Sequence, residues 1–119
     1  MDLQPYHLLA KAYADLDAEQ IIGQLSDDCV YESQMVLEPL IGREAIAAYL
    51  RIKFETIRDS GQKIVAEVRT VPCLANQPCV ILGQYGDFVA VVLASFIDSG
   101  KISRIDLCVV PGPTETRSL

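Results

Sequence analysis

The stretch from Leu25 to Arg58, LSDDCVYESQMVLEPLIGREAIAAYLRIKFETIR, decides the fold. It begins with a short run of β-forming residues, Cys29 to Ser33, followed by a loop that Pro39 and Gly42 interrupt. After Gly42 the apolar residues recur at helical spacing on one face, and Ser60–Gly61 supplies a stop. The stretch therefore predicts one strand that leads through a loop into one long amphipathic helix.

The flanking sequence predicts two more helices before this unit and a run of strands after it. An apolar stripe predicts a helix from about Pro5 to Asp15, and Asp17 is a suitable cap for a second, shorter one. Gly86–Asp87 and Ser99–Gly100 are typical of hairpin turns. The order of helices and strands indicates an α+β fold. The four downstream strands are expected at Ile64–Val71, Cys79–Tyr85, Phe88–Ile97 and Ile102–Val110.

Length and composition favour a single domain, residues 1–119, with an ordered core of about 5–110 and a frayed tail, 111–119, after the proline pair. Half of the residues are hydrophobic and the net charge is −6. Without a basic stripe or an apolar run of about 20 residues, neither nucleic acid nor a membrane is expected as a partner. The N-terminus lacks a signal-peptide pattern, so we expect a cytoplasmic protein.

Three segments carry a family resemblance: Leu25–Tyr31, Gly42–Tyr49 and Gly100–Asp106. With them the chain resembles the nuclear transport factor 2-like superfamily, which includes SnoaL-like polyketide cyclases, ketosteroid isomerases and limonene epoxide hydrolases. The resemblance implies an α+β cone barrel, in which a curved, mostly antiparallel sheet wraps around three helices and leaves a pocket at one end. It also implies a homodimer formed through the sheet. Fold alone does not fix the chemistry.

The residues that carry catalysis in these enzymes are only partly present. The resemblance aligns the catalytic aspartate of ketosteroid isomerases with Ser33, their second aspartate with Leu93 and their first-helix tyrosine near Ala10, with Tyr13 within reach. A serine cannot move a proton between carbon atoms near neutral pH without a base beside it. Steroid-type isomerisation is therefore not expected.

The catalytic residues of limonene epoxide hydrolases match this sequence better, but their set is also incomplete here. Tyr31 and Ser33 fall on the water-orienting positions of limonene epoxide hydrolase, and Asp106 falls within one residue of its general base. The Arg-x-Asp pair of those enzymes is absent, and Gly83–Gly86 occupies that region. Asp106 has two interpretations: a base in the pocket, or the ion-pair partner of Arg104 on the same face of the strand.

Alternation along residues 29–35 places Tyr31, Ser33 and Met35 on one face and Glu32 and Gln34 on the other, and a one-residue slip would exchange them. Glu38 and Lys53 are further candidates, although a solvated loop charge for Glu38 and a packed stem for Lys53 are the favoured explanations.

The remaining reactive side chains favour structural roles. The four cysteines lie apart, and buried reduced thiols are expected. The alternative is a bridge between Cys73 and Cys79 under oxidation, because these two residues flank one loop. His7, the only histidine, is expected to be an ordinary residue of the first helix. No metal or cofactor is expected.

Two functions follow from the sequence. In the first, the protein is a cofactor-free acid/base enzyme (a hydrolase, cyclase or isomerase) that acts on an apolar or carbonyl-bearing molecule with Asp106, Tyr31 and Ser33. In the second, it is a non-catalytic module that binds a hydrophobic or amphipathic ligand or dimerises. In either, the residues expected to bind the small molecule are Met35, Tyr49, Lys53, Phe88, Val91 and Cys108.

Overall fold

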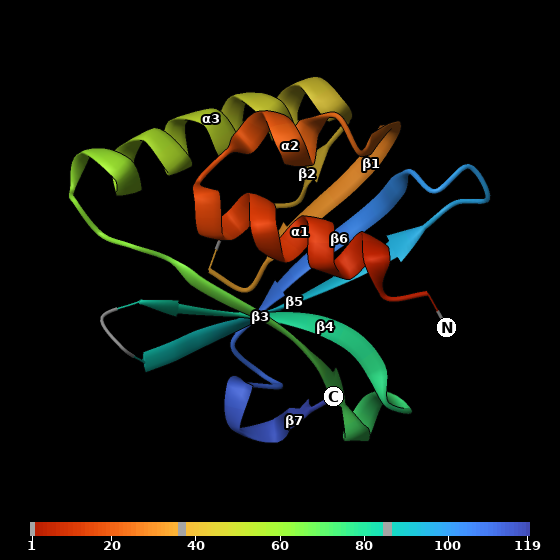
Figure 1. Ribbon diagram of the computed structural model, residues 1–119. Helices are drawn as coiled ribbons and strands as arrows, with labels where there is room; N and C mark the ends of the chain where they lie inside the picture. Colours follow the sequence, from red (N-terminus) through yellow and green to blue (C-terminus); the bar gives the residue numbers. More distant parts are fainter. Residues whose placement is uncertain (1, 36–37, 85–86) are drawn as a thin grey trace.

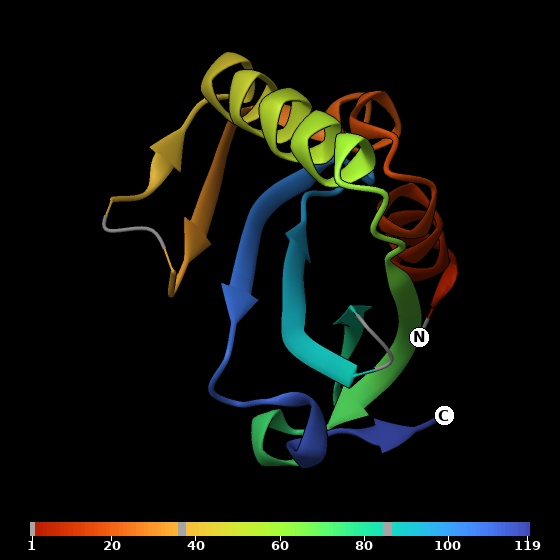
Figure 2. The same ribbon diagram turned by 90° about the vertical axis from the view of Figure 1, so that its left-hand side faces the viewer.

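The computed structural model describes residues 2–35, 38–84 and 87–119, and in these residues three helices pack on one curved sheet of seven strands (Figure 1, Figure 2). The predicted α+β class is confirmed. The helices are α1 (Gln4–Asp15), α2 (Ala18–Ile22) and α3 (Arg43–Asp59), with short 3₁₀ helices η1 (Pro72–Leu74) and η2 (Pro113–Glu115). The strands are β1 (Leu25–Ser33), β2 (Leu40–Ile41), β3 (Val65–Val71), β4 (Gln77–Gln84), β5 (Asp87–Phe96), β6 (Ile102–Cys108) and β7 (Arg117–Ser118).

The sheet has the order β2-β1-β6-β5-β4-β3-β7. Only the pairing of β1 with β6 is parallel, so the expected mostly antiparallel sheet is confirmed. Register shifts interrupt the pairing of β5 with both of its neighbours. Such irregularities bend strands, and β5 curves strongly in Figure 2. The helices lie on one side of the curved sheet (Figure 1).

Local sequence accounts for the helices. Asp17 caps α2 by accepting a hydrogen bond from the Glu19 amide at 3.1 Å, as expected. The predicted long helix is confirmed as α3, which buries Ile46, Leu50 and Phe54. The expected turn at Ser99–Gly100 is present, with Gly100 at a φ of +88°. The other expected turn, Gly86–Asp87, lies partly outside the described residues.

Two hydrophobic clusters cover the two faces of the sheet. The larger one fills the space between the helices and the inner face. A smaller one lies on the outer face, because its member Val91 is next to Val92 of the larger cluster and successive side chains of a strand point to opposite faces. The outer cluster consists of Val71, Cys79, Ile81, Val91 and Cys108, with Leu93 packed against it.

The C-terminal segment, residues 109–119, folds back onto the sheet. The helix η2 contacts β5 and β7 pairs with β3, where the sequence predicts a frayed tail. The Gln34 side chain holds the start of this segment: its Oε1 accepts from the Val109 and Val110 amides at 2.6 and 2.9 Å, and its Nε2 donates to the Val110 carbonyl at 2.7 Å. These contacts join residues that are 75 and 76 positions apart in the sequence, so local sequence patterns cannot predict them.

Candidate functional site

A cavity of about 410 Å³ lies between α1, α3 and the inner face of the sheet. Its volume is within the range of small-molecule sites, roughly 300–1,000 Å³. The lining is mostly apolar, and the exposed Met35 contributes to it. The lining residues are Tyr13, Leu16, Tyr31, Met35, Leu50, Lys53, Phe54, Thr56, Ile57, Ile64, Leu82, Gln84, Ala90 and Leu107.

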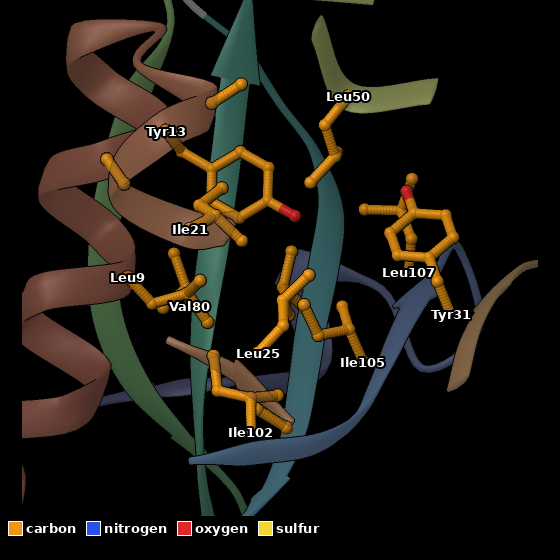
Figure 3. Close-up of a cluster of buried hydrophobic side chains, with 14 of the residues drawn as sticks. Leu9, Tyr13, Ile21, Leu25, Tyr31, Leu50, Val80, Ile102, Ile105 and Leu107 are labelled. Atoms are coloured by element: carbon orange, nitrogen blue, oxygen red, sulfur yellow. The ribbon is translucent and has the colours of Figure 1, made fainter. Parts of the chain in front are cut away.

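Tyr13 brings an unsatisfied polar atom to this cavity. The side chain is only 5% exposed, and its ring packs on Phe54 with the centroids 5.6 Å apart. Its hydroxyl is buried without a hydrogen-bond partner among the described residues. Figure 3 shows this hydroxyl directed toward the side of the interior where Tyr31 lies. Buried polar atoms normally have partners, so this hydroxyl is suited to an acceptor on a bound molecule.

Tyr31, Tyr49 and Lys53 form a connected polar group beside Tyr13. The Lys53 ammonium donates to the Tyr49 hydroxyl at 3.1 Å and lies 5.5 Å from the centre of that ring. The ring centroids of Tyr31 and Tyr49 are 5.4 Å apart. Tyr49 thus touches two lining residues, although it does not itself line the cavity. Three elements, α1, β1 and α3, therefore bring their polar atoms to one region of the interior.

Burial raises the pKa of the two lining tyrosines further above neutrality. It raises the pKa of Tyr13, with a smaller contribution from Tyr49. Burial also raises the pKa of Tyr31, together with the neighbouring Tyr13 and Tyr49 and a hydrogen bond with Tyr49. Both hydroxyls thus keep their protons near neutral pH and can donate. Among the residues that the structure describes, no carboxylate or imidazole lines the cavity to serve as a general base.

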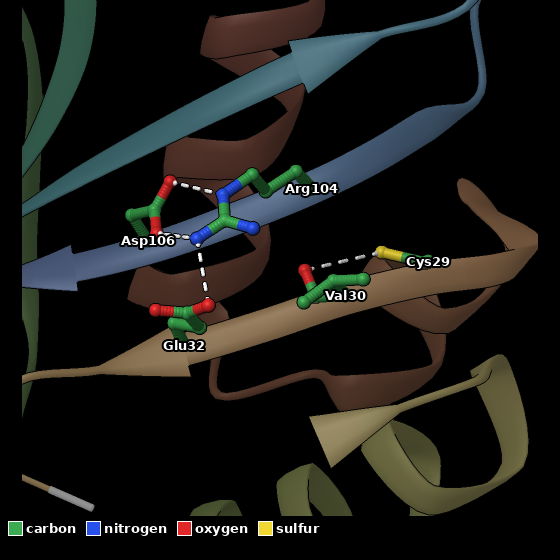
Figure 4. A network of polar contacts seen from close by, with 5 residues as sticks. All are labelled: Cys29, Val30, Glu32, Arg104 and Asp106. Atoms are coloured by element: carbon green, nitrogen blue, oxygen red, sulfur yellow. Dashed lines mark hydrogen bonds and ion pairs between the residues drawn. The ribbon is translucent and has the colours of Figure 1, made fainter. Parts of the chain in front are cut away.

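Asp106 lies on the outer face of the sheet, away from this cavity. Tyr31 pairs with Ile105 and Glu32 pairs with Asp106, so Tyr31 and Asp106 point to opposite faces. The Arg104 guanidinium donates twice to Asp106, each time at 3.0 Å, and also contacts Glu32 at 2.9 Å (Figure 4). Both carboxylates raise the pKa of Arg104, Asp106 first. Of the two interpretations of Asp106, the structure shows the ion pair with Arg104.

Ser33 does not join Tyr31 in the cavity either. Its hydroxyl oxygen accepts a hydrogen bond from the Met35 amide at 3.1 Å, which closes the turn after β1. It borders a separate hollow of about 230 Å³ that Asp106 also lines, at the end of β1 and β6. Of the three side chains expected to act together, only Tyr31 lines the apolar cavity, whereas Ser33 and Asp106 border the separate hollow.

Four residues expected to bind the small molecule do not line the cavity: Tyr49, as described above, and also Val91, Cys108 and Phe88. Val91 and Cys108 belong to the outer hydrophobic cluster. Phe88 lies against Gly83, where an added Cβ would meet the ring at 3.1 Å, and its ring centre is 5.3 Å from the Arg69 guanidinium. Strand β5 is apolar on both faces because the outer cluster needs apolar residues too, so hydrophobicity alone does not distinguish its inner side.

The other reactive residues have structural surroundings. All four cysteines are free, with Cys29, Cys79 and Cys108 buried and Cys73 exposed. His7 on α1 and Glu38 in its loop are exposed. Across residues 2–35, 38–84 and 87–119, no group of three or more His, Cys, Asp or Glu side chains could hold a metal ion. No helix in those ranges is long and apolar enough to cross a bilayer.

A wider depression of about 970 Å³ lies at the start of α3, but it is a weaker candidate. It is an open surface lined by charges of both signs, including Asp27, Arg43 and Glu44. Its Arg51 is already paired with Glu19 at 2.7 Å. The apolar cavity is therefore the candidate site.

The fold and cavity together define an α+β cone with an apolar pocket. Comparison with solved structures agrees: a SnoaL-like protein of unknown function from Burkholderia thailandensis superposes with a TM-score of 0.71 at 16% identity, over 88% of this chain and 91% of that one. An uncharacterised cystatin-fold protein from Novosphingobium aromaticivorans matches with a TM-score of 0.60 at 18% identity, over 89% of this chain and 96% of that one.

In the sequence comparisons, no protein-family model and no curated protein matches the chain. A third solved structure, a protein with a cystatin-like fold from Silicibacter pomeroyi, has a TM-score of 0.65 at 14% identity over 87% of this chain and 71% of that one. The expected likeness to the nuclear transport factor 2-like superfamily is thus confirmed at the level of fold. At such low identity the likeness carries no activity to this chain.

Proposed function

We propose that this protein binds a small, largely apolar molecule in the cavity under α1 and α3, without transforming it. The observation that carries the proposal is the buried Tyr13 hydroxyl, which lines an apolar cavity of about 410 Å³ and has no partner in the described part of the chain. A bound acceptor, such as a carbonyl oxygen, would complete its hydrogen bonding.

Binding is favoured over acid/base catalysis by the kind of polar groups around the cavity. Tyr13, Tyr31 and Lys53 are donors, since a tyrosine is protonated near neutral pH and burial raises the pKa of these two further. The enzyme alternative relied on Asp106, whose carboxylate is paired with Arg104 on the other face of the sheet. That alternative lacks a base at the site.

A fluorescence titration with N-phenyl-1-naphthylamine, an uncharged apolar probe, tests the proposal. We expect saturable binding of one probe per chain. Ala90→Phe should abolish it by filling the cavity, because Ala90 is buried and lines the cavity. Ala48→Phe, on the exposed side of α3, is the matched control and should bind normally.

Circular dichroism would show whether Ala90→Phe folds, and Leu82→Phe, at a half-buried lining position, is the second blocking variant. Equal binding by a folded blocking variant and by the Ala48→Phe control would contradict the proposal, as would the absence of saturable binding to the unaltered protein.

The homodimer through the sheet stays a prediction. The C-terminal segment lies over part of the outer face, and the surface around Arg104 on β1 and β6 remains for a second copy. Light scattering coupled to gel filtration would measure the mass, and Arg104→Glu should reduce it to that of one chain if this surface is the interface.

A further inference from the structure

We infer that the ligand is an amphipathic monoanion, whose apolar body fills the cavity and whose charged group is held by Lys53. This inference rests on the proposed binding function and specifies the class of ligand. It follows from how Lys53 is partnered, from the donors around it and from the absence of acids in the described lining.

Lys53 is the one charged residue in the described lining of the cavity. It is half-buried, and its ammonium donates to the neutral Tyr49 hydroxyl. Among the described residues no carboxylate lies within ion-pair distance of it, although the chain has 16 acidic residues against 10 lysines and arginines. Partial burial of a cation costs free energy unless an opposite charge accompanies it.

Some of the other cations have a carboxylate partner, whereas Arg58 and Lys101 donate to the backbone carbonyls of Leu16 and Gly23. Lys11 pairs with Asp15 at 2.5 Å, Arg51 with Glu19 at 2.7 Å and Arg69 with Glu67 at 3.0 Å. The Lys53 side chain is less exposed to solvent than the exposed Lys11 and Arg51, yet its partner is a neutral hydroxyl rather than a carboxylate. A packed lysine stem accounts for its position on α3 but not for a contact to a hydroxyl rather than to an acid.

The groups next to Lys53 also favour an anion in the cavity, because they too are hydrogen-bond donors. Tyr49 connects Lys53 to Tyr31, and the free Tyr13 hydroxyl lies in the same part of the interior. An ammonium and protonated hydroxyls present donors, which an anionic oxygen accepts more strongly than a neutral one. The other polar lining residues, Thr56 and Gln84, are uncharged. The cavity therefore discriminates in favour of one negative charge on an apolar body.

A matched pair of probes tests this inference. N-phenyl-1-naphthylamine is uncharged, and 8-anilinonaphthalene-1-sulfonate has the same ring system with one added sulfonate. We expect the unaltered protein to bind the anion about tenfold or more tightly than the neutral probe. Lys53→Met keeps an apolar stem but removes the charge, so it should remove that preference and make the affinities for the two probes equal within about twofold.

Two control variants accompany the measurement. Lys53→Arg should keep the preference because the charge remains, and Lys11→Met, at an exposed position of α1, should change neither affinity. Retained neutral-probe binding by Lys53→Met would show an intact cavity, so a folding defect is recognised directly.

The outcomes separate the two proposals. Failure of both probes to bind saturably would overturn the binding function itself. Binding of the neutral probe with equal affinity for the anion, or an anion preference that survives Lys53→Met, would overturn the inference about charge and leave the binding function standing.

Discussion

Arg104 donates two hydrogen bonds to Asp106, two residues further along the same strand and on the sheet face turned away from the cavity. Glu32 on the neighbouring strand gives the guanidinium a second carboxylate. These side chains are 39%, 29% and 48% exposed for Arg104, Asp106 and Glu32, so water screens all three. The network is a set of surface ion pairs that links β1 to β6, rather than a buried reactive group.

Asp106→Asn should therefore be mild. Because Arg104 keeps Glu32 as a partner, we expect the free energy of unfolding in urea to fall by about 1 kcal/mol or less. Binding of an apolar probe in the cavity should not change. A loss of probe binding in a stable Asp106→Asn protein would contradict the placement of this residue outside the site.

Arg104→Met should destabilise the protein more than Asp106→Asn does. Removing the arginine leaves Glu32 and Asp106, which are directly paired across the two strands, without their shared cation. Like charges opposite each other in a sheet are destabilising. Urea unfolding at low and high salt measures the effect, and added salt should narrow the difference between the two variants. A salt-independent difference would point to lost packing instead.

Tyr13→Phe should stabilise the empty protein while it weakens binding. The substitution removes a buried hydroxyl that lacks a partner in the described chain, and such a group costs roughly 1–3 kcal/mol. We expect an unfolding free energy higher by about 1 kcal/mol. Affinity for a carbonyl-bearing probe such as 6-propionyl-2-dimethylaminonaphthalene should fall about five- to tenfold. A less stable variant with unchanged affinity would show that the hydroxyl is satisfied within the folded chain.

Stability should fall on the alkaline side. Burial raises the pKa of the Cys29 and Cys79 thiols to about 11, and it raises the pKa of Tyr13 and Tyr31 as well. As the pH rises, these groups therefore lose their protons in the unfolded chain before they lose them in the folded protein. Their contribution is therefore complete below about pH 8 and is lost as the pH rises through the thiol and then the tyrosine range.

Urea unfolding at pH 8, 10 and 11 checks this dependence. Tyr31→Phe should flatten the decline above about pH 10, because it removes one of the titrating groups. A decline that is the same in Tyr31→Phe and in the unaltered protein would exclude this tyrosine as a contributor.

Gln34→Ala should loosen the C-terminal segment. The substitution removes three hydrogen bonds that join the end of β1 to Val109 and Val110. Because these bonds are exposed, we expect a loss of about 1–2 kcal/mol together with faster hydrogen exchange at the two amides. Gln4→Ala, at an exposed position of α1, is the control. Unchanged exchange at Val109 and Val110 would mean that η2 and β7 hold the segment without Gln34.

The sequence was most informative where one local signal dominates. The helical spacing after Gly42 predicted α3, and Asp17 predicted the start of α2. For the site, Tyr31, Met35 and Lys53 were expected at the cavity and line it. The helix expectations depend on a repeat or a cap within a few residues, which sequence displays directly, whereas the place of Tyr31 was implied by the family resemblance.

The face of Asp106 depends on which residues of β1 and β6 are paired, and alternation within one strand does not reveal that register. Val91 was expected in the cavity because β5 is apolar throughout, and the reason for its outward apolar side is the outer cluster and the C-terminal segment near it. The sequence also does not show that the Tyr13 hydroxyl lacks a partner. The periodicity of α1 predicts that the ring is buried, but whether its oxygen finds a partner depends on the residues that pack around it in the folded interior.

The parallel pairing of β1 with β6 has a consequence for how the chain assembles. Leu25 pairs with Ile102 and Ser33 with Leu107, so the first long strand meets a partner near the other end of the sequence. The hairpins of β3 with β4 and β5 with β6 join near neighbours and need little chain closure. During synthesis, β1 and the cavity wall beside it must therefore wait for almost the whole domain to emerge. The part of the cavity wall that Tyr31 and Leu107 form is completed only with that long-range pairing.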